Sequence, residues 1–193
     1  MILDKNQLSS FAISAEYNQR SVISQYRTFY AGKNCSVFLS HKHDDIQQLQ
    51  HVTTILKSLD AYVYVDWLDK SLPQSPNEVT ASKIKEAIKK YDKFILVATD
   101  GAIASKWCNW ELGYGDAQKY NANKIVLFPI AQTGLKWTGY EYMKLYPTIE
   151  YWDGVIYSYI IHGYPSKGFH VVYHYGTEKI IPLGEWLNLS LIH

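Results

Sequence analysis

One glutamate set among tryptophans is the residue of this sequence whose type and setting best suit chemistry. Glu111 lies in the segment SKWCNWELG, which follows a short apolar run and opens with Ser105, a residue type that caps helices. On such a helix Trp107 and Glu111, four residues apart, share one face. A carboxylate beside a large flat side chain suits contact with a sugar or a nucleotide. The spacing alone, however, fits better a packed helix whose glutamate is exposed.

Apolar runs that alternate with amphipathic segments predict the elements that would position Glu111. Short apolar runs typical of buried strands occupy residues 35–40, 61–66, 93–99 and 124–130. Residues at helical spacing separate each run from the next. This alternation predicts an α/β fold with a central parallel sheet flanked by helices, of the flavodoxin-like open type, with the first run as its central strand.

The ligand-binding edge of such a sheet follows from its topology, because ligands bind outside the carboxyl ends of the strands. Three predicted loops lie at that edge: 40–45, 66–77 and 100–106. We therefore expect these loops to border one cleft, together with the start of the helix that carries Glu111.

The segments that flank this core predict additions to a single domain. Helical spacing over residues 8–30 predicts helical structure before the first strand, and residues 154–161 are predicted as a fifth core strand. Residues 169–175 and 180–183 predict a hairpin. The predicted organisation has three parts: an N-terminal helical extension (1–32), a core domain (33–161) and a C-terminal antiparallel β appendage packed on it (162–193).

The composition describes a protein that can bury a core without disulfides or metals. Of its 193 residues, 47% are hydrophobic and 15% aromatic. A formal net charge of +1 gives no basic field for a phosphate backbone, so we expect no nucleic-acid partner. The N-terminus lacks the apolar run of a signal peptide and no apolar segment is long enough to span a bilayer, so we expect a cytoplasmic protein without a membrane partner. Cys35 and Cys108 suit a reduced protein better than a disulfide framework.

Other kinds of site find less support in the sequence. It contains neither a GxSxG nucleophile motif nor a GxxxxGKS phosphate loop. His41 and His43 precede two aspartates, but side chains two residues apart on an extended segment point to opposite faces, so we expect no metal site. Cys108 lies at a predicted helix start, yet the sequence places no histidine to act as its base. A buried structural thiol is therefore the favoured interpretation.

Four motifs occur in one order along the core: VFLSHKHDD at the first strand, VDW before a proline-containing loop, KFILVAT at the third strand, and SKWCNWELG after it. Over about residues 33–130 this order resembles the TIR domain and its bacterial TIR-like relatives, whose helix after the third strand begins S-x-W-C-x-x-E. The chain departs from the family at His41, where a tyrosine is usual, and after residue 130. With its additions it looks most like the TIR component of the Thoeris anti-phage defence system.

The resemblance implies an enzyme that cleaves the nicotinamide glycosidic bond of NAD, with NAD as substrate and no cofactor. Glu111 maps onto the glutamate that contacts the nicotinamide ribose, which implies that it is catalytic and stabilises an oxocarbenium-like centre. Attack by water would give ADP-ribose, and attack from within the same molecule would give a cyclic ADP-ribose-type signal that activates a partner effector. The further substrate-binding residues that we predict are Ser40, His41, Asp44, Asp66, Trp67, Ser105 and Trp107.

Two other functions stay open at this point. Many TIR domains are non-catalytic scaffolds that assemble through the loop after the second strand, and this mode includes homo-oligomers. A nucleoside deoxyribosyltransferase-like enzyme would share the fold type and a carboxylate-driven glycosidic step. The presence of Glu111 favours the NAD-cleaving enzyme, since a pure scaffold has no need for it.

Overall fold

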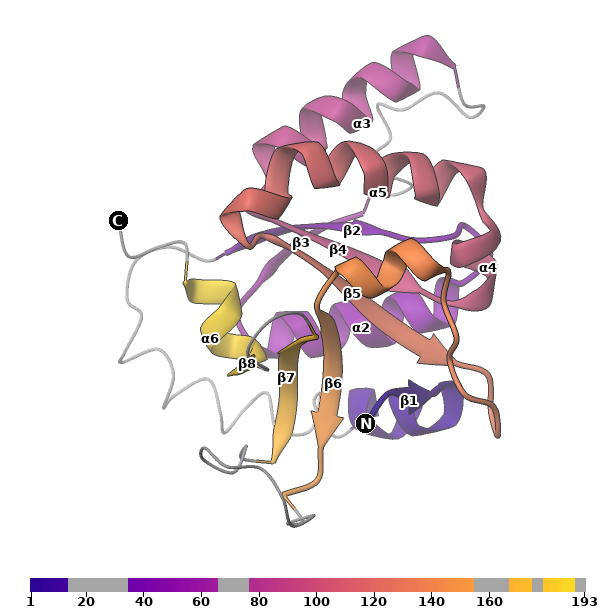
Figure 1. The fold of residues 1–193 in the computed structure, drawn as a ribbon, viewed down its shortest axis with the longest axis vertical. Coiled ribbons are helices and arrows are strands. Elements are labelled where there is room, and N and C mark those ends of the chain that lie inside the picture. The colour runs from indigo at the N-terminus through magenta and orange to yellow at the C-terminus, as the bar shows by residue number, and fades with distance from the viewer. Residues whose placement is uncertain (14–34, 66–76, 155–166, 175–178, 190–193) are drawn as a thin grey trace.

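The computed structural model describes residues 1–13, 35–65, 77–154, 167–174 and 179–189 (Figure 1). Its strands are β1 (Leu3–Asp4), β2 (Ser36–Ser40), β3 (Tyr62–Tyr64), β4 (Lys93–Ala98), β5 (Ile125–Ala131), β6 (Thr148–Trp152), β7 (Gly168–Tyr173) and β8 (Lys179–Pro182). Its labelled helices are α2 (Ile46–Ser58), α3 (Glu78–Lys90), α4 (Asp100–Ala104), α5 (Lys106–Lys119) and α6 (Leu183–Asn188), with 3-10 helices η2 (Tyr120–Ala122) and η3 (Glu141–Leu145). Residues 5–13 are also helical.

The sheet has the predicted parallel core. Its strand order is β3-β2-β4-β5-β6-β7-β8, and the pairs from β3 to β6 are all parallel. Helices α3 and α5 cover one face, while α2 and α6 cover the other (Figure 1). This is the flavodoxin-like order, with its topological switch point between β2 and β4. The predicted fold class is confirmed.

Buried apolar runs explain why β4 and β5 form the centre of the sheet. Every residue of both strands is buried, because helices cover both faces of the sheet. The first predicted strand, β2, is not central as expected. It lies between β4 and the edge strand β3.

The N-terminal residues belong to the sheet. In β1, which the sequence did not predict, Leu3 pairs in parallel with Ile130 of β5. The backbone of Met1 exchanges hydrogen bonds of 2.9 and 3.0 Å with Tyr151 of β6. β1 therefore fills the gap where the ends of β5 and β6 diverge, and Leu8 of the following helical turn is buried in the core.

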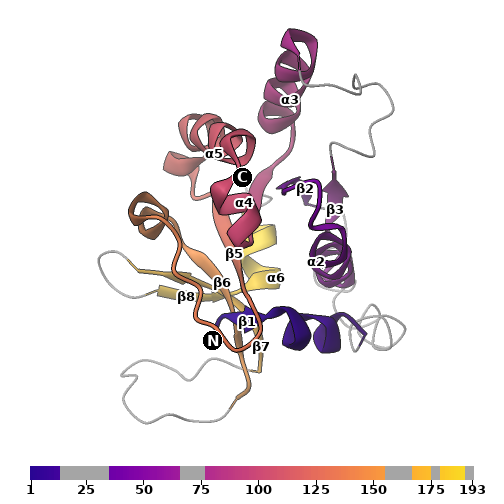
Figure 2. The same ribbon diagram turned by 90° about the vertical axis from the view of Figure 1, so that its right-hand side faces the viewer.

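The C-terminal region continues the same sheet. The fifth parallel strand is β6, within residues 131–153, where the sequence pattern indicated no strand. Of the strand expected at 154–161, only Gly154 lies in the described part of the chain, and it forms a bend. The antiparallel pair β7–β8 confirms the pairing of the predicted hairpin. The antiparallel pair β6–β7, which was not predicted, joins these two strands to the parallel core. Figure 2 shows the sheet extending from β3 on one side to β8 on the other.

A short helix follows the hairpin. Leu183, predicted in the last strand, instead begins α6, whose Trp186 is fully buried against the sheet. Within the described ranges, no helix combines the length and apolar character needed to cross a membrane.

Candidate active site

Glu111 is held at the switch point of the sheet. Ser40 is the last residue of β2, and its hydroxyl donates a hydrogen bond of 2.5 Å to the Glu111 carboxylate. The exposed fraction is 1% for Ser40 and 2% for Glu111. On α5, Glu111 shares the buried face with Cys108 and Leu112. The alternative of an exposed glutamate on a packed helix is therefore wrong, because Glu111 points toward the sheet.

Two helix starts bring Glu111 to this position. Residues 100–104, expected as loop, form the short helix α4, and the Thr99 hydroxyl caps it by accepting from the Ala102 amide at 3.0 Å. Ser105 caps α5 as predicted, accepting from the Cys108 amide at 3.3 Å. The Asn109 side-chain amide donates to the carbonyls of Ile103 and Ser105, which fixes the turn between the two helices.

A second contact ties the loop after β2 to the end of β4. Thr99 donates a short hydrogen bond to the carboxylate of Asp45. Asp45 occupies the N-cap position of α2 but makes no side-chain cap bond there. On the same loop, the side chain of Lys42 lies so close to Gly101 that a Cβ there would come within 2.9 Å of its Cδ. The loops that follow β2 and β4 are therefore in direct contact.

Thr99 is a site residue that the sequence reasoning missed. It sits at the end of an apolar run, where it reads as the last residue of a strand. The available signal was a threonine followed by Asp100, since threonine is a capping residue type and acidic residues are favoured in the first turn of a helix.

The other predicted residues lie in different settings. His41 is buried and its Nδ1 lies 3.1 Å from the Leu39 carbonyl oxygen, two residues back. Asp44 is exposed and forms a surface ion pair with Lys42 at 2.9 Å, which lowers the pKa of the Asp44 carboxyl. Asp66 and Trp67 lie outside the described residues. Ser40 and Glu111 are thus brought together, whereas Asp44 lies at the surface.

Trp107 belongs to an aromatic row along α5. Its ring stacks on Trp110 with centroids 4.8 Å apart. The Trp110 ring stacks in turn on Tyr114, with centroids 6.3 Å apart. The ammonium group of Lys85, on α3, lies 5.7 Å from the Trp110 ring centroid. The row therefore helps to join α5 to α3 and fixes the rotation of the helix that carries Glu111.

The segment after β5 covers the same end of the sheet. The Trp137 indole donates to the Ala98 carbonyl at 2.7 Å, and the Tyr142 hydroxyl donates to the side-chain oxygen of Asn109. The segment after β5 therefore holds both the end of β4 and the start of α5. Among the described residues there is no cluster of His, Cys, Asp or Glu that could hold a metal ion.

This geometry coincides with a family match. The family model of the TIR domain matches residues 37–153. The chain belongs to the TIR domain family. The matched region of this TIR domain spans β2 to β6, so it includes Ser40 and Glu111 and leaves β1, β7 and β8 outside. No curated protein matches the chain. TIR domains in general are NAD-processing enzymes or signalling scaffolds, and they commonly oligomerise.

Proposed function

We propose that this TIR domain is an enzyme that cleaves the bond between nicotinamide and ribose in NAD, with Glu111 as the catalytic residue. The observation that carries the proposal is the position of Glu111, a carboxylate held by Ser40 at the switch point of a parallel sheet. Open α/β sheets bind their ligands in the crevice at this point.

The proposed step starts when the C–N glycosidic bond breaks. Its electron pair leaves with nicotinamide, which becomes neutral, and the ribose carbon becomes positively charged. A carboxylate in a setting of low dielectric constant stabilises this charge more strongly than one in water does. Water attack would then form ADP-ribose and release a proton, while attack by a group of the same molecule would form a cyclic isomer.

Burial sets a condition on this mechanism. Since only 2% of the surface of Glu111 is exposed, the surroundings of the carboxylate have to open before ribose can reach it. Ser40 contacts the carboxylate directly, so in this proposal it positions Glu111 in addition to contacting the substrate. Before ribose binds, the Ser40 hydroxyl donates its hydrogen bond to the Glu111 carboxylate.

The finer part of the proposal concerns the product and its use. The resemblance to Thoeris TIR components supports a cyclic ADP-ribose-type signal that activates a separate effector protein during anti-phage defence. Substrate contacts from Ser105 and Trp107, from Ser40, His41 and Asp44 after β2, and from Asp66 and Trp67 remain part of the same proposal.

The test is incubation of the purified protein with NAD, alone and with extract of phage-infected cells, with nicotinamide and its co-products measured by mass spectrometry. We expect Glu111→Gln to slow nicotinamide release by about 10²–10³-fold, the usual effect of removing one transition-state charge contact. Glu86→Gln, which changes an exposed glutamate on α3, is the matched control and should leave the rate unchanged. Full turnover by Glu111→Gln, or no turnover by the wild-type protein in either condition, would contradict the proposal.

A scaffold function is the second candidate, and one observation favours it. A buried glutamate with a serine partner is also what a purely structural residue looks like. The scaffold function predicts that the wild-type protein releases no nicotinamide, and that folded Glu111→Gln protein assembles as the wild type does in sedimentation velocity experiments.

A further inference from the structure

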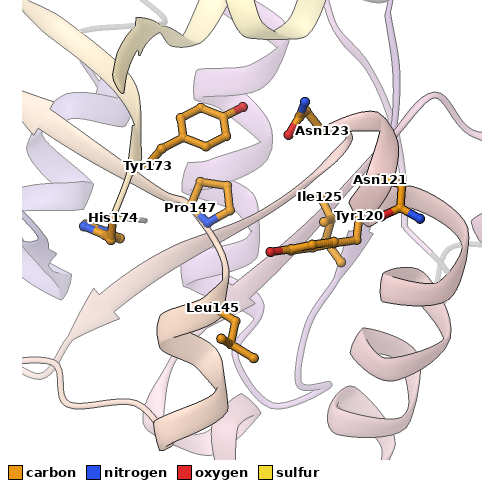
Figure 3. Close-up of a pocket in the computed structure, with 8 residues that line it drawn as sticks. All are labelled: Tyr120, Asn121, Asn123, Ile125, Leu145, Pro147, Tyr173 and His174. Carbon is orange, nitrogen blue, oxygen red and sulfur yellow. The ribbon is translucent and has the colours of Figure 1, made fainter. Parts of the chain in front are cut away.

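A pocket lies at the opposite edge of the sheet from Glu111. Its volume is about 330 Å³, and its lining comes from the turn after α5, the start of β5, the segment before β6 and the end of β7 (Figure 3). Since β5 and β6 begin here, this is the amino edge of the parallel strands. Ser40, in contrast, ends β2 at the carboxyl edge.

Flat apolar surfaces form part of the lining. The rings of Tyr120 and Tyr173 reach into the pocket from η2 and β7, and the buried Pro147 lies between them (Figure 3). Tyr120 is held edge-on against Tyr146, with centroids 6.0 Å apart. Aromatic faces of this kind stack on planar rings with little regard to their identity.

Side-chain amides supply the polar groups. Asn121 and Asn123 line the pocket, and the Asn123 amide faces the Tyr173 hydroxyl across it (Figure 3). Each amide offers donors and an acceptor side by side. The backbone of Asn123 is left-handed, with φ 53°, a conformation that glycine would satisfy equally well. The turn therefore does not require an amide at this position.

The charges around the pocket disfavour an anionic ligand. None of the described residues that line it is Lys, Arg, Asp or Glu, and its one imidazole, that of His174, lies 2.8 Å from the Thr148 hydroxyl. The C-terminal end of α5 points at this edge, and the negative end of a helix dipole repels anions. A phosphate group would find no lysine or arginine among the described side chains that line the pocket.

We propose that this pocket binds an uncharged planar heteroaromatic ring with neighbouring hydrogen-bond donor and acceptor groups, the chemistry that nucleobases and nicotinamide share. The Tyr120 ring stacks on the bound ring, Tyr173 closes the pocket from β7, and the asparagines hydrogen-bond the edge of the bound ring, as asparagine does with adenine. The volume lies at the lower end of the roughly 300–1,000 Å³ of small-molecule sites, which suits a base or a nucleoside rather than a dinucleotide. The proposal does not depend on Glu111.

The test is isothermal titration calorimetry of the full chain with adenosine and, separately, with nicotinamide. We expect saturable binding of at least one, and a Kd raised about tenfold or more by Asn121→Ala, by Asn123→Gly and by Tyr120→Leu. Asn123→Gly removes the amide while it preserves the left-handed backbone, and circular dichroism checks that each variant is folded.

Two controls separate this site from the candidate active site. Tyr140→Ala removes an exposed tyrosine outside the pocket and should leave the Kd unchanged, whereas a loss of binding in Glu111→Gln would place the bound probe at the other edge of the sheet. Binding of adenosine would identify a nucleobase site, and binding of nicotinamide a site for that amide. No binding of either probe at millimolar concentration, binding that the three pocket substitutions do not weaken, or binding that Glu111→Gln abolishes would overturn the proposal, whatever the outcome of the NAD assay.

Discussion

Ser40 and Glu111 are joined by a hydrogen bond of 2.5 Å across 71 positions of sequence, and both side chains are buried. The bond links the end of β2 to the helix that follows β4. It therefore couples the position of the carboxylate to the sheet rather than to its own helix alone.

Replacing Ser40 by alanine tests this coupling. A buried carboxylate that loses a hydroxyl donor destabilises the fold, so we expect the free energy of unfolding in urea to fall by about 1–3 kcal/mol. If NAD is the substrate, kcat should fall more than KM changes, because the carboxylate loses its orientation. Ser40→Thr keeps the hydroxyl and should restore both quantities. Wild-type stability of Ser40→Ala would show that the bond has no structural role.

Two glycines of α5 form a matched pair for testing how closely this helix lies on the sheet. A Cβ on Gly115 would come within 2.9 Å of the Phe94 ring, whereas a Cβ on Gly113 would meet nothing within 4 Å. We expect Gly113→Ala to raise the free energy of unfolding by about 0.5–1 kcal/mol through helix propensity. Gly115→Ala should lower it by about 1–2 kcal/mol, since overpacking exceeds that gain. Equal effects would mean that α5 can move away from β4.

Local patterns made most of the fold predictable, and the missed elements are those without such a pattern. The strands β4 and β5 are continuous apolar runs, which is why they were found. The helix α4 has only five residues and β1 only two, both shorter than the window over which periodicity can be seen. The strand β6, TIEYW, does carry a β-branched and aromatic signal, but it is embedded in a segment rich in aromatic residues and turns.

The shared position of Ser40 and Glu111 was predictable from the sequence, but the contacts around them were not. The strand order was enough to bring Glu111 and Ser40 to one edge. The bond between Asp45 and Thr99 depends on the exact packing of two loops that lie 54 positions apart. No local propensity encodes such a contact, because it exists only once the sheet has formed.

Lys93 should make stability depend on pH. Its ammonium group lies 4.4 Å from the Trp186 ring centroid, and burial lowers its pKa from 10.5 to about 8. Between these two values the unfolded chain binds more protons than the folded protein, so the free energy of unfolding should rise with pH over that window. In urea titrations Lys93→Met should lack this rise and be more stable at pH 7 by about 1–3 kcal/mol. A wild-type pH profile in the variant would contradict the assignment.

Cys35 should make the free energy of unfolding change with pH in the opposite direction. Burial raises the pKa of its thiol from 9.0 to about 12, while the charge of Lys93 partly offsets this effect. Between pH 9 and 12 the folded protein binds more protons than the unfolded chain, so the free energy of unfolding should fall as pH rises. Subtracting the free energy of unfolding of Cys35→Ala from that of the wild-type protein removes the contribution of the tyrosines, which both proteins share, and leaves that of Cys35. A difference that stays constant from pH 9 to 11 would show that the thiol titrates alike in both states.

The strand β1 pairs with β5, and Met1 just before it hydrogen-bonds to Tyr151 of β6, 150 positions away, so the N-terminal segment needs both β5 and β6 as neighbours. Closing so long a loop costs chain entropy before any contact repays it, so we expect this pairing to form after the folding transition state. Leu3→Ala should then speed unfolding in stopped-flow experiments and leave the folding rate unchanged. A slower folding rate would place β1 in the nucleus. If Leu3→Ala changes only the unfolding rate, the strand that comes first in the sequence joins the sheet late in folding.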